Sequence, residues 1–388
     1  MVEGGVPVGV IGAGNVSHVY LGTAARFPVL DVVAVADLDL EKARAVAQKF
    51  GVPHACSVEE LLSDPRIELV ANLTVPSAHG TVGMAVVEAS KALYNEKPLT
   101  TTREEAQLLL RAADARGVRV GGAPDTFLGG SIQACRELID AGAIGEPIGA
   151  TAVTVRAGPE SWHPNPGFFY QQGAGPLFDL GPYYITCLVT LLGPIRSVTG
   201  SARITFSERA IKVGPMKGSS IPVDTPTYVT ATLEFATGLI ATLITTFDVV
   251  VSDLPHVEIY GSEGTVNLVD PTIFGGRVGV SRGPDEGWRA VRPRHRFTRA
   301  EDRGIGLAEM AFAMRAGRPH RAGRELAYHV LDVMSAIYDS AQSGRRVDIV
   351  STCDRPAPIA PEWPADERNG DVAAPPPSAA AATATAGG

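Results

Sequence analysis

Several features are scarce or absent in this 388-residue sequence, and each absence excludes a class of protein. No basic block occurs and the formal net charge is −8, so neither nucleic acid nor an anionic membrane is an expected partner. No apolar run is long enough to span a bilayer, and the first strand-like segment begins too near Met1 for a signal peptide, so we expect a cytoplasmic protein. The cysteines form no C-x-x-C pair, which predicts a reducing compartment and no zinc or other metal site: Cys56, Cys135, Cys187 and Cys353.

Lysine is also scarce, because arginine supplies most of the basic residues. Only six of the 34 Lys and Arg residues are lysines: 42, 49, 91, 97, 212 and 217. A lysine within an apolar stretch is therefore a candidate for a specific role. The length and the 45% hydrophobic content predict two domains of ordinary globular type.

Residues 1–147 alternate short apolar runs with helical patterns. This alternation predicts an α/β domain with a parallel Rossmann sheet and right-handed crossovers. The expected strands are Val6–Ile11, Val32–Ala36, Glu68–Leu73, Ala92–Tyr94 and Val118–Gly121. The expected helices are Val16–Arg26, Leu40–Phe50, Ala78–Ser90, Thr102–Arg116 and Gly130–Ala141.

Residues 148–350 show a different pattern, rich in Val, Thr and Ile with period-two alternation. It predicts an α+β domain with an open, mainly antiparallel sheet, which can leave one face free. Helices at 307–316 and 325–343 are expected to pack back on the first domain, and residues 369–388 are expected to be disordered. The expected strands are Ile148–Arg156, Thr227–Phe235, Leu239–Phe247, His256–Tyr260 and Thr265–Val269.

A glycine turn directly follows the first expected strand. Gly12 permits the tight turn, Gly14 lets the backbone approach a pyrophosphate, and the amides of Asn15 and Val16 at the helix start would face its negative charge. Ser17 takes the place of the third glycine of the usual motif. A glycine-rich turn of another α/β protein is the alternative interpretation.

Asp37 closes the second expected strand and favours dinucleotide binding over that alternative. Its carboxylate can accept hydrogen bonds from both ribose hydroxyls and would repel a 2′-phosphate. The sequence therefore predicts NAD as cofactor, in preference to NADP.

Two further loops are expected at the same edge of the sheet. Thr74 and Pro76 would form a cofactor-binding loop, whereas His79 is either a cofactor contact or a helix-start histidine satisfied by its neighbours. Glu96 and Lys97 follow the next strand, and Glu96 could orient the ribose of the cofactor or steady the ammonium of Lys97. Partial desolvation is expected to lower the pKa of Lys97 and make it a proton donor and acceptor, and the alternative is an ordinary surface charge pair.

Asp179 and Tyr183, four positions apart, are expected at the start of one helix. They could bind a sugar hydroxyl and accept its proton, or Asp179 could cap the helix while Tyr183 packs. Upstream, Trp162 and His163 belong to an aromatic, proline-stiffened loop. This loop is interpreted as a carbohydrate-facing wall or as a dimer contact.

Taken together, these motifs resemble the glucose–fructose oxidoreductase/inositol dehydrogenase (Gfo/Idh/MocA) family over most of residues 5–350. The resemblance implies that Lys97 is a catalytic acid/base and that Asp179 binds substrate and tunes this lysine. Tyr183 stands where many members have histidine and resembles the tyrosine-containing branch. This leaves the proton acceptor open between Tyr183 and Lys97.

The resemblance implies an NAD(P)-dependent oxidoreductase that acts on a hydroxyl of a sugar or cyclitol, as a homodimer or homotetramer formed through the open sheet. Two alternatives stay open. One is cleavage of glycosides by transient oxidation with bound NAD. The other is a non-catalytic regulator that binds a sugar or nucleotide.

Overall fold

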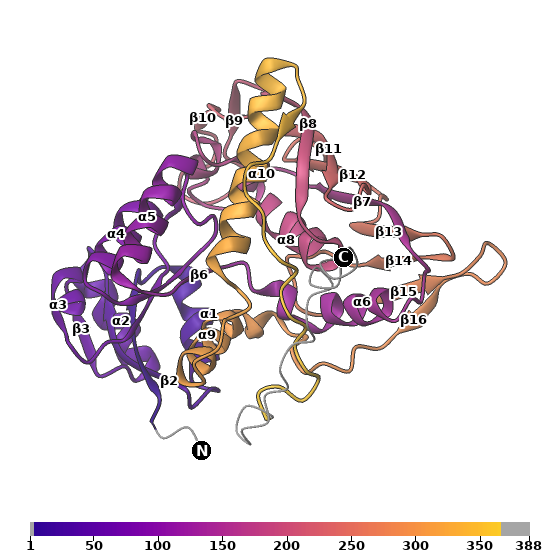
Figure 1. Cartoon of the computed structure of the whole chain (residues 1–388). Coiled ribbons are helices and arrows are strands. Elements are labelled where there is room, and N and C mark those ends of the chain that lie inside the picture. Colours follow the sequence, from indigo (N-terminus) through magenta and orange to yellow (C-terminus); the bar gives the residue numbers. More distant parts are fainter. Residues whose placement is uncertain (1–3, 366–388) are drawn as a thin grey trace, which may run out of the picture.

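The first half of the chain folds around a six-stranded sheet in the computed structural model, which describes residues 4–365 (Figure 1). All its strand pairs are parallel, in the order β3-β2-β1-β4-β5-β6. The strands are β1 Val6–Ile11, β2 Leu30–Ala36, β3 His54–Cys56, β4 Leu69–Asn72, β5 Ala92–Asn95 and β6 Val120–Gly122. The helices are α1 Asn15–Ala24, α2 Leu40–Phe50, α3 Val58–Ser63, the 3-10 turn η1 Pro76–Ala78, α4 His79–Glu88 and α5 Arg103–Arg116.

The Rossmann prediction is confirmed, and the differences are local. The sequence did not predict β3 or α3, because segments of three and six residues carry little periodicity. The strand expected at Val118–Gly121 lies at Val120–Gly122. Helices cover both faces of a parallel sheet, so its strands are continuous apolar runs. In β1 the adjacent residues Val10 and Ile11, which point to opposite faces, are each 1% exposed.

The second half of the chain forms a nine-stranded sheet in the order β16-β15-β14-β13-β7-β12-β11-β8-β17. Its neighbours are antiparallel except β7 and β12, which are parallel, so the sheet is mixed and mainly antiparallel as expected. The strands are β7 Pro147–Val155, β8 Ile195–Arg203, β11 Tyr228–Phe235, β12 Ile240–Thr246, β13 Val257–Gly261, β14 Gly264–Leu268, β15 Val278–Ser281, β16 Arg289–Val291 and β17 Val347–Asp348. A separate hairpin pairs β9 Glu208–Ala210 with β10 Ser220–Pro222.

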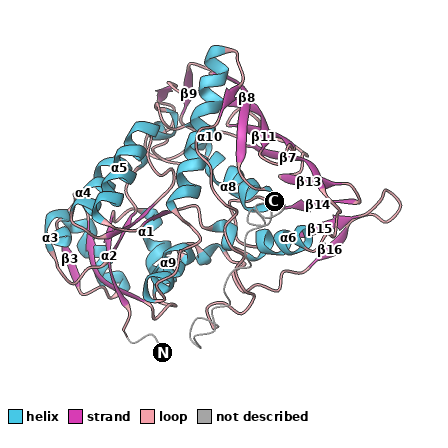
Figure 2. Cartoon of the chain, viewed as in Figure 1, coloured by secondary structure: helices cyan, strands magenta, loops and turns pink. Residues whose placement is uncertain are grey.

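Helices lie on the side of the second sheet that faces the first sheet (Figure 2). The residues of β12 alternate between exposed and buried, which leaves the opposite face of the sheet open. The 3-10 turns of this half are η2 Thr126–Leu128, η3 Pro159–Ser161, η4 Gly167–Tyr170 and η5 Ala300–Asp302. The helices are α6 Gly130–Asp140, α7 Gly175–Asp179, α8 Gly181–Leu192, α9 Ile305–Arg315 and α10 Arg324–Ser343.

The two late helices connect the halves of the molecule. α9 contacts α1, whereas α10 contacts β8 and α8 of the second half together with α5 and β6 of the first. Arg103 on α5 forms ion pairs of 2.6 Å with Asp332 and 2.5 Å with Asp339 on α10. We propose a domain boundary at residue 147, where the second sheet begins.

Two sequence expectations concern other features of the chain. The tail at 369–388 lies outside the described residues. Among residues 4–365, the structure contains no helix whose length and apolarity would allow it to cross a membrane.

Candidate active site

The carboxyl ends of the central parallel strands meet at one edge of the first sheet. Ile11 pairs with Ala36 on one side and with Asn72 on the other, and Asn72 pairs with Asn95. The loops that follow these residues therefore lie next to one another, at the edge where open α/β sheets bind ligands. All the motifs of the first half lie here.

The glycine turn closely matches its predicted geometry. Gly12 has φ +104°, and a Cβ at this position would lie 2.7 Å from the carbonyl oxygen of Leu73, so only glycine fits. Gly14 borders open space. Within residues 4–365 the backbone N–H groups of Gly14, Asn15 and Val16 have no partner, so these donors are free to bind an anion.

Ser17 and Asp37 brace this turn. The Ser17 hydroxyl donates to the carbonyl of Gly14 at 2.7 Å, and its side chain is fully buried at the position of the third glycine. The Asp37 carboxylate accepts hydrogen bonds from the N–H groups of Ala13 at 2.8 Å and Asp39 at 2.9 Å. Each of its oxygens keeps a further lone pair, so Asp37 remains able to bind ribose hydroxyls.

The loop after β4 is held by a buried polar network. The Asn72 amide donates to the Asn95 side chain at 2.8 Å, and the Thr74 hydroxyl donates to Asn72 at 2.7 Å. His79 is only 1% exposed, with its ring nitrogens 2.6 Å from the carbonyl of Pro98 and 3.1 Å from that of Thr74. The structure thus places His79 as a brace between two loops.

Protonation of His79 is disfavoured at this position. Burial lowers its pKa, and the hydrogen bonds to the carbonyls of Pro98 and Thr74 offset only part of this effect. Thr74 and Pro76 remain half-buried on the loop at the edge of the sheet.

Lys97 extends from the loop after β5 to the second half of the chain. Its ammonium donates to Asp179 Oδ1 at 2.7 Å and to the Asp179 carbonyl at 2.8 Å, and lies 5.2 Å from the centre of the Tyr183 ring. The structure therefore brings together the three predicted catalytic residues.

The expected lowering of the Lys97 pKa is wrong. Burial lowers the pKa of Lys97, but its electrostatic interactions with Asp179, Tyr183 and Glu96 raise the pKa by more, so the net shift is upward. Without a ligand, Lys97 is therefore an ammonium.

The helix expected to start at Asp179 also differs from the structure. Asp179 is the last residue of α7, and α8 starts at Gly181 with no side-chain cap. The carboxylate is therefore free of a capping role and faces Lys97.

The phenol of Tyr183 lies against an arginine that the sequence did not single out. Arg303 donates from Nη1 to Tyr183 Oη at 2.6 Å and lies 3.9 Å from Glu96. Glu96 in turn accepts hydrogen bonds from the Tyr20 hydroxyl at 2.8 Å and the Lys97 N–H at 2.9 Å. Glu96 thus positions the lysine loop from within the protein.

Asp125 is a second site residue that sequence reasoning missed. Asp125 follows β6 at the same edge of the sheet as the other loops, and this position could have identified it as a site residue from the sequence. Arg303 had no comparable local signal, because it lies in a loop before α9 far along the chain.

Trp162 and His163 lie in the predicted aromatic loop, but no hydrogen bond or ring contact within residues 4–365 joins them to Lys97, Asp179 or Tyr183. Trp162 is 62% exposed and its ring packs edge-on against His163 and Phe169. The loop therefore presents an aromatic surface to its surroundings.

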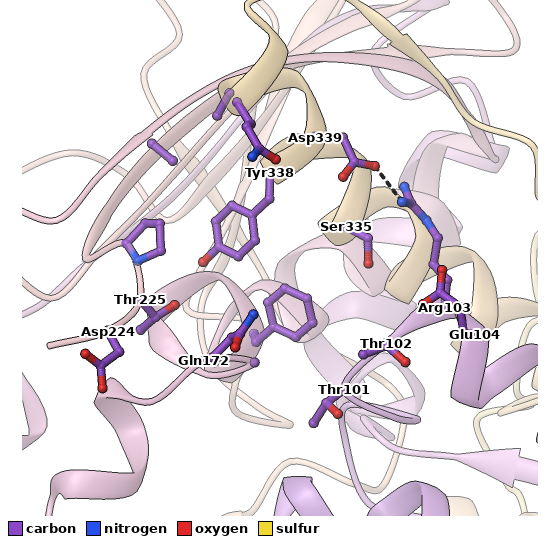
Figure 3. A pocket seen from close by; sticks show the side chains of 16 residues that line it. Thr101, Thr102, Arg103, Glu104, Gln172, Asp224, Thr225, Ser335, Tyr338 and Asp339 are labelled. Atoms are coloured by element: carbon purple, nitrogen blue, oxygen red, sulfur yellow. Dashed lines mark hydrogen bonds and ion pairs between the residues drawn. The ribbon is translucent and has the colours of Figure 1, made fainter.

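A cavity of about 770 Å³ lies between the start of α5 and α10 (Figure 3). Its lining includes Tyr338, Gln172 and Thr225, whose side chains surround the hollow, and the Arg103–Asp339 ion pair. Phe178, the residue before Asp179, forms part of its wall, but Lys97, Asp179 and Tyr183 do not. The cavity thus lies beside the group formed by Lys97, Asp179 and Tyr183. Among residues 4–365, no cluster of His, Cys, Asp and Glu has the composition of a metal site.

Comparison with known proteins adds independent findings. Residues 6–122 match the model of an oxidoreductase family with an NAD-binding Rossmann fold (GFO_IDH_MocA), and residues 132–267 match the GFO/IDH/MocA C-terminal domain. The oxidoreductase ORF334 of Rhizobium meliloti is 27% identical over 329 residues, or 81% of this chain and 90% of that protein.

One more relative and one solved structure have names that state a substrate. A scyllo-inositol 2-dehydrogenase (NADP(+)) of Bacillus subtilis is 28% identical over 243 residues, which cover 58% of this chain and 65% of that protein. A levoglucosan dehydrogenase, solved in complex with NADH and L-sorbose, has a TM-score of 0.78 at 22% identity, covering 89% of this chain and 99% of that structure. The structural similarity establishes a shared fold.

Proposed function

The chain is an NAD(P)-dependent oxidoreductase of the Gfo/Idh/MocA family, and from this premise we propose that it transfers hydride between a nicotinamide nucleotide and a hydroxyl or carbonyl group of a sugar, cyclitol or sugar derivative. The observation that carries this proposal is the Lys97–Asp179 pair, with Tyr183 beside it, at the carboxyl edge of the nucleotide-binding sheet.

The glycine turn fits a dinucleotide. The clearance around Gly14 and the unpartnered N–H groups of residues 14–16 suit a pyrophosphate, and the remaining lone pairs of Asp37 suit a ribose. When bound, the nicotinamide would supply the hydride acceptor or donor. Thr74 and Pro76 border the same edge and would line its path.

The Asp37 carboxylate supports a preference for NAD. A 2′-phosphate would be placed against a negative charge that two backbone amides already hold in position. We therefore propose NAD as the preferred cofactor.

The three proposed catalytic residues would each have a different role at a substrate hydroxyl. Lys97 has one N–H left after its two bonds to Asp179 and would donate it to the substrate oxygen, which stabilises negative charge there. The free oxygen of Asp179 would accept a hydrogen bond from a neighbouring hydroxyl. Tyr183 completes the site as the group that exchanges a proton.

The test is a panel of sugars, cyclitols and glycosides with NAD⁺ and NADP⁺, followed at the NADH absorption band. We expect NADH to form with at least one polyol, faster with NAD⁺ than with NADP⁺. Release of a free sugar from a glycoside without net NADH would instead identify a glycoside-cleaving enzyme. No reaction with any compound, despite NADH binding, would indicate a non-catalytic regulator.

The open sheet supports a proposed homodimer or homotetramer. Register places Thr199, Thr232, Thr242, Thr151 and Glu258 side by side across five strands. This row consists of four threonines and one charged residue, so a second copy of the chain could cover it. Light scattering should give a mass above the 40.6 kDa of one chain, and Thr242→Arg should lower it.

The aromatic loop supports a further part of the proposal. The exposed Trp162 ring and the neighbouring His163 would contact the sugar ring or the second subunit. If Trp162→Ala binds substrate more weakly but keeps the oligomeric mass of the wild type, this result would favour a contact with the sugar ring.

A further inference from the structure

Arg303 is a buried cation in direct contact with the catalytic phenol. Its side chain is 18% exposed, its Nη1 lies 2.6 Å from Tyr183 Oη, and its guanidinium carbon lies 5.3 Å from the centre of that ring. Burial lowers the pKa of Arg303, but the charges of Tyr183, Glu96 and Asp125 raise it by more. The guanidinium therefore stays charged in this environment.

The backbone around Arg303 is fixed from two sides. The buried Asp125 accepts hydrogen bonds from the N–H groups of Gly304 at 2.7 Å and Gly306 at 3.0 Å. Gly304 has φ +103°, a conformation that suits glycine and directs the chain into α9. Glu96 lies 3.9 Å from the guanidinium on the nucleotide side. The position of the positive charge is therefore set by the fold itself.

Lys97 is poorly suited to accept a proton. An ammonium has three donors and no lone pair, and two of the donors bind Asp179. Tyr183 Oη is better suited to accept a proton than Lys97. It accepts a hydrogen bond from Arg303, and its ring faces the Lys97 ammonium. A cation that donates to an oxygen stabilises negative charge on that oxygen.

We propose that Arg303 is a positioning residue that makes Tyr183, and not Lys97, the proton acceptor in alcohol oxidation. The inference rests on the proposed function. In the oxidation step the hydrogen on the substrate carbon would leave as a hydride, for which a bound nicotinamide nucleotide would supply the acceptor. The O–H bond breaks and its proton goes to the Tyr183 phenolate, which becomes a phenol, and the substrate becomes a carbonyl compound. In the reverse direction Tyr183 returns the proton.

The first test needs no substrate. The ultraviolet absorption of tyrosinate is measured through a pH titration of the wild type and of Tyr183→Phe. The difference between the two curves reports on the phenol of Tyr183 alone. With Arg303→Gln as the background for the same subtraction, we expect the tyrosinate signal to appear at a higher pH than in the wild-type background, because the cation that donates to the phenol oxygen is gone. Arg303→Lys, which keeps a cation, should fall between the two. An unchanged titration in Arg303→Gln would overturn the proposal.

The second test uses a substrate found with the polyol panel. Arg303→Gln should lower kcat of oxidation about 10²-fold at neutral pH and move the rising limb of the kcat–pH profile upward, with partial rescue in Arg303→Lys. The double variant with Tyr183→Phe should be no slower than Tyr183→Phe alone. If Arg303→Gln lowers kcat by the same factor at every pH, or if the kcat losses of Arg303→Gln and Tyr183→Phe add in the double variant, then Arg303 has only a structural role.

Arg296→Gln is the matched control, because Arg296 is exposed and forms no hydrogen bond or ion pair within the described residues. It should leave both measurements unchanged. If the panel yields no oxidised polyol, the proposed function fails, while the tyrosinate titration still decides the role of Arg303.

Discussion

The ammonium nitrogen of Lys97 lies 2.7 Å from a carboxylate oxygen of Asp179, a residue 82 positions further along the chain. The pair joins the edge of the nucleotide-binding sheet to the end of α7 in the second half. With side chains 16% and 25% exposed, it is shielded from water but still reachable by a ligand. A substrate held there would contact residues from both halves.

Lys97→Met should greatly reduce turnover while leaving cofactor binding intact. The substitution removes the positive charge beside the reacting oxygen, and we expect kcat to fall about 10²- to 10⁴-fold. Turnover assays and NADH fluorescence titration measure the two properties separately. Lys217→Met, at an exposed lysine, is the control and should be fully active. Wild-type turnover in Lys97→Met would remove this residue from catalysis.

The two glycines of the turn should respond differently to alanine. Gly12→Ala places a Cβ against the Leu73 carbonyl at a positive φ and should destabilise the fold by about 2 kcal/mol, measured by urea unfolding. Gly14→Ala has open space and an ordinary φ of −79°, so stability should not change. Its methyl group would instead meet the pyrophosphate and weaken NADH binding. Equal effects of the two variants would contradict this division.

Asp37→Asn should relax the cofactor preference. The amide keeps an acceptor oxygen for the Ala13 N–H but removes the charge that repels a 2′-phosphate. We expect the ratio of kcat/KM for NADP⁺ to that for NAD⁺ to rise about tenfold, which corresponds to about 1.4 kcal/mol. Asp39→Asn, which removes a charge from the exposed cap of α2, is the control. A ratio that stays constant in Asp37→Asn would show that the preference is set elsewhere.

Asp125 should make stability depend on pH. Burial raises its pKa to about 6, although Arg303 and the N–H groups of Gly306 and Gly304 lower it in part. The folded state therefore binds the proton more tightly than the unfolded chain, and the contribution of Asp125 to stability decreases as pH rises from about 4 to about 6.

The matched comparison is with Asp125→Asn, which keeps an acceptor for both amides. Relative to this variant, the wild type should gain about 2 kcal/mol in free energy of unfolding between about pH 7 and about pH 4. Urea titrations of both proteins at a series of pH values measure the difference. A difference that does not vary with pH would show that the carboxyl titrates normally.

Features carried by a few neighbouring residues were predictable from the sequence. The glycine turn, Asp37 and the Lys97 loop each follow an apolar strand, and parallel strands bring their carboxyl ends to one edge. The short β3 and the polar β8 escaped prediction, because their hydrophobic patterns are too brief or too mixed.

The sequence by itself determined the succession of a Rossmann domain and a mainly antiparallel sheet, the nucleotide-binding edge, and the three residues predicted to act at the site. The tertiary structure alone decided how these groups act on one another. Arg303 meets Tyr183 across 120 positions of sequence, and Lys97 has a raised pKa because Asp179 lies beside it. Electrostatic interactions depend on distances between charges, and these distances exist only once the two sheets have packed together.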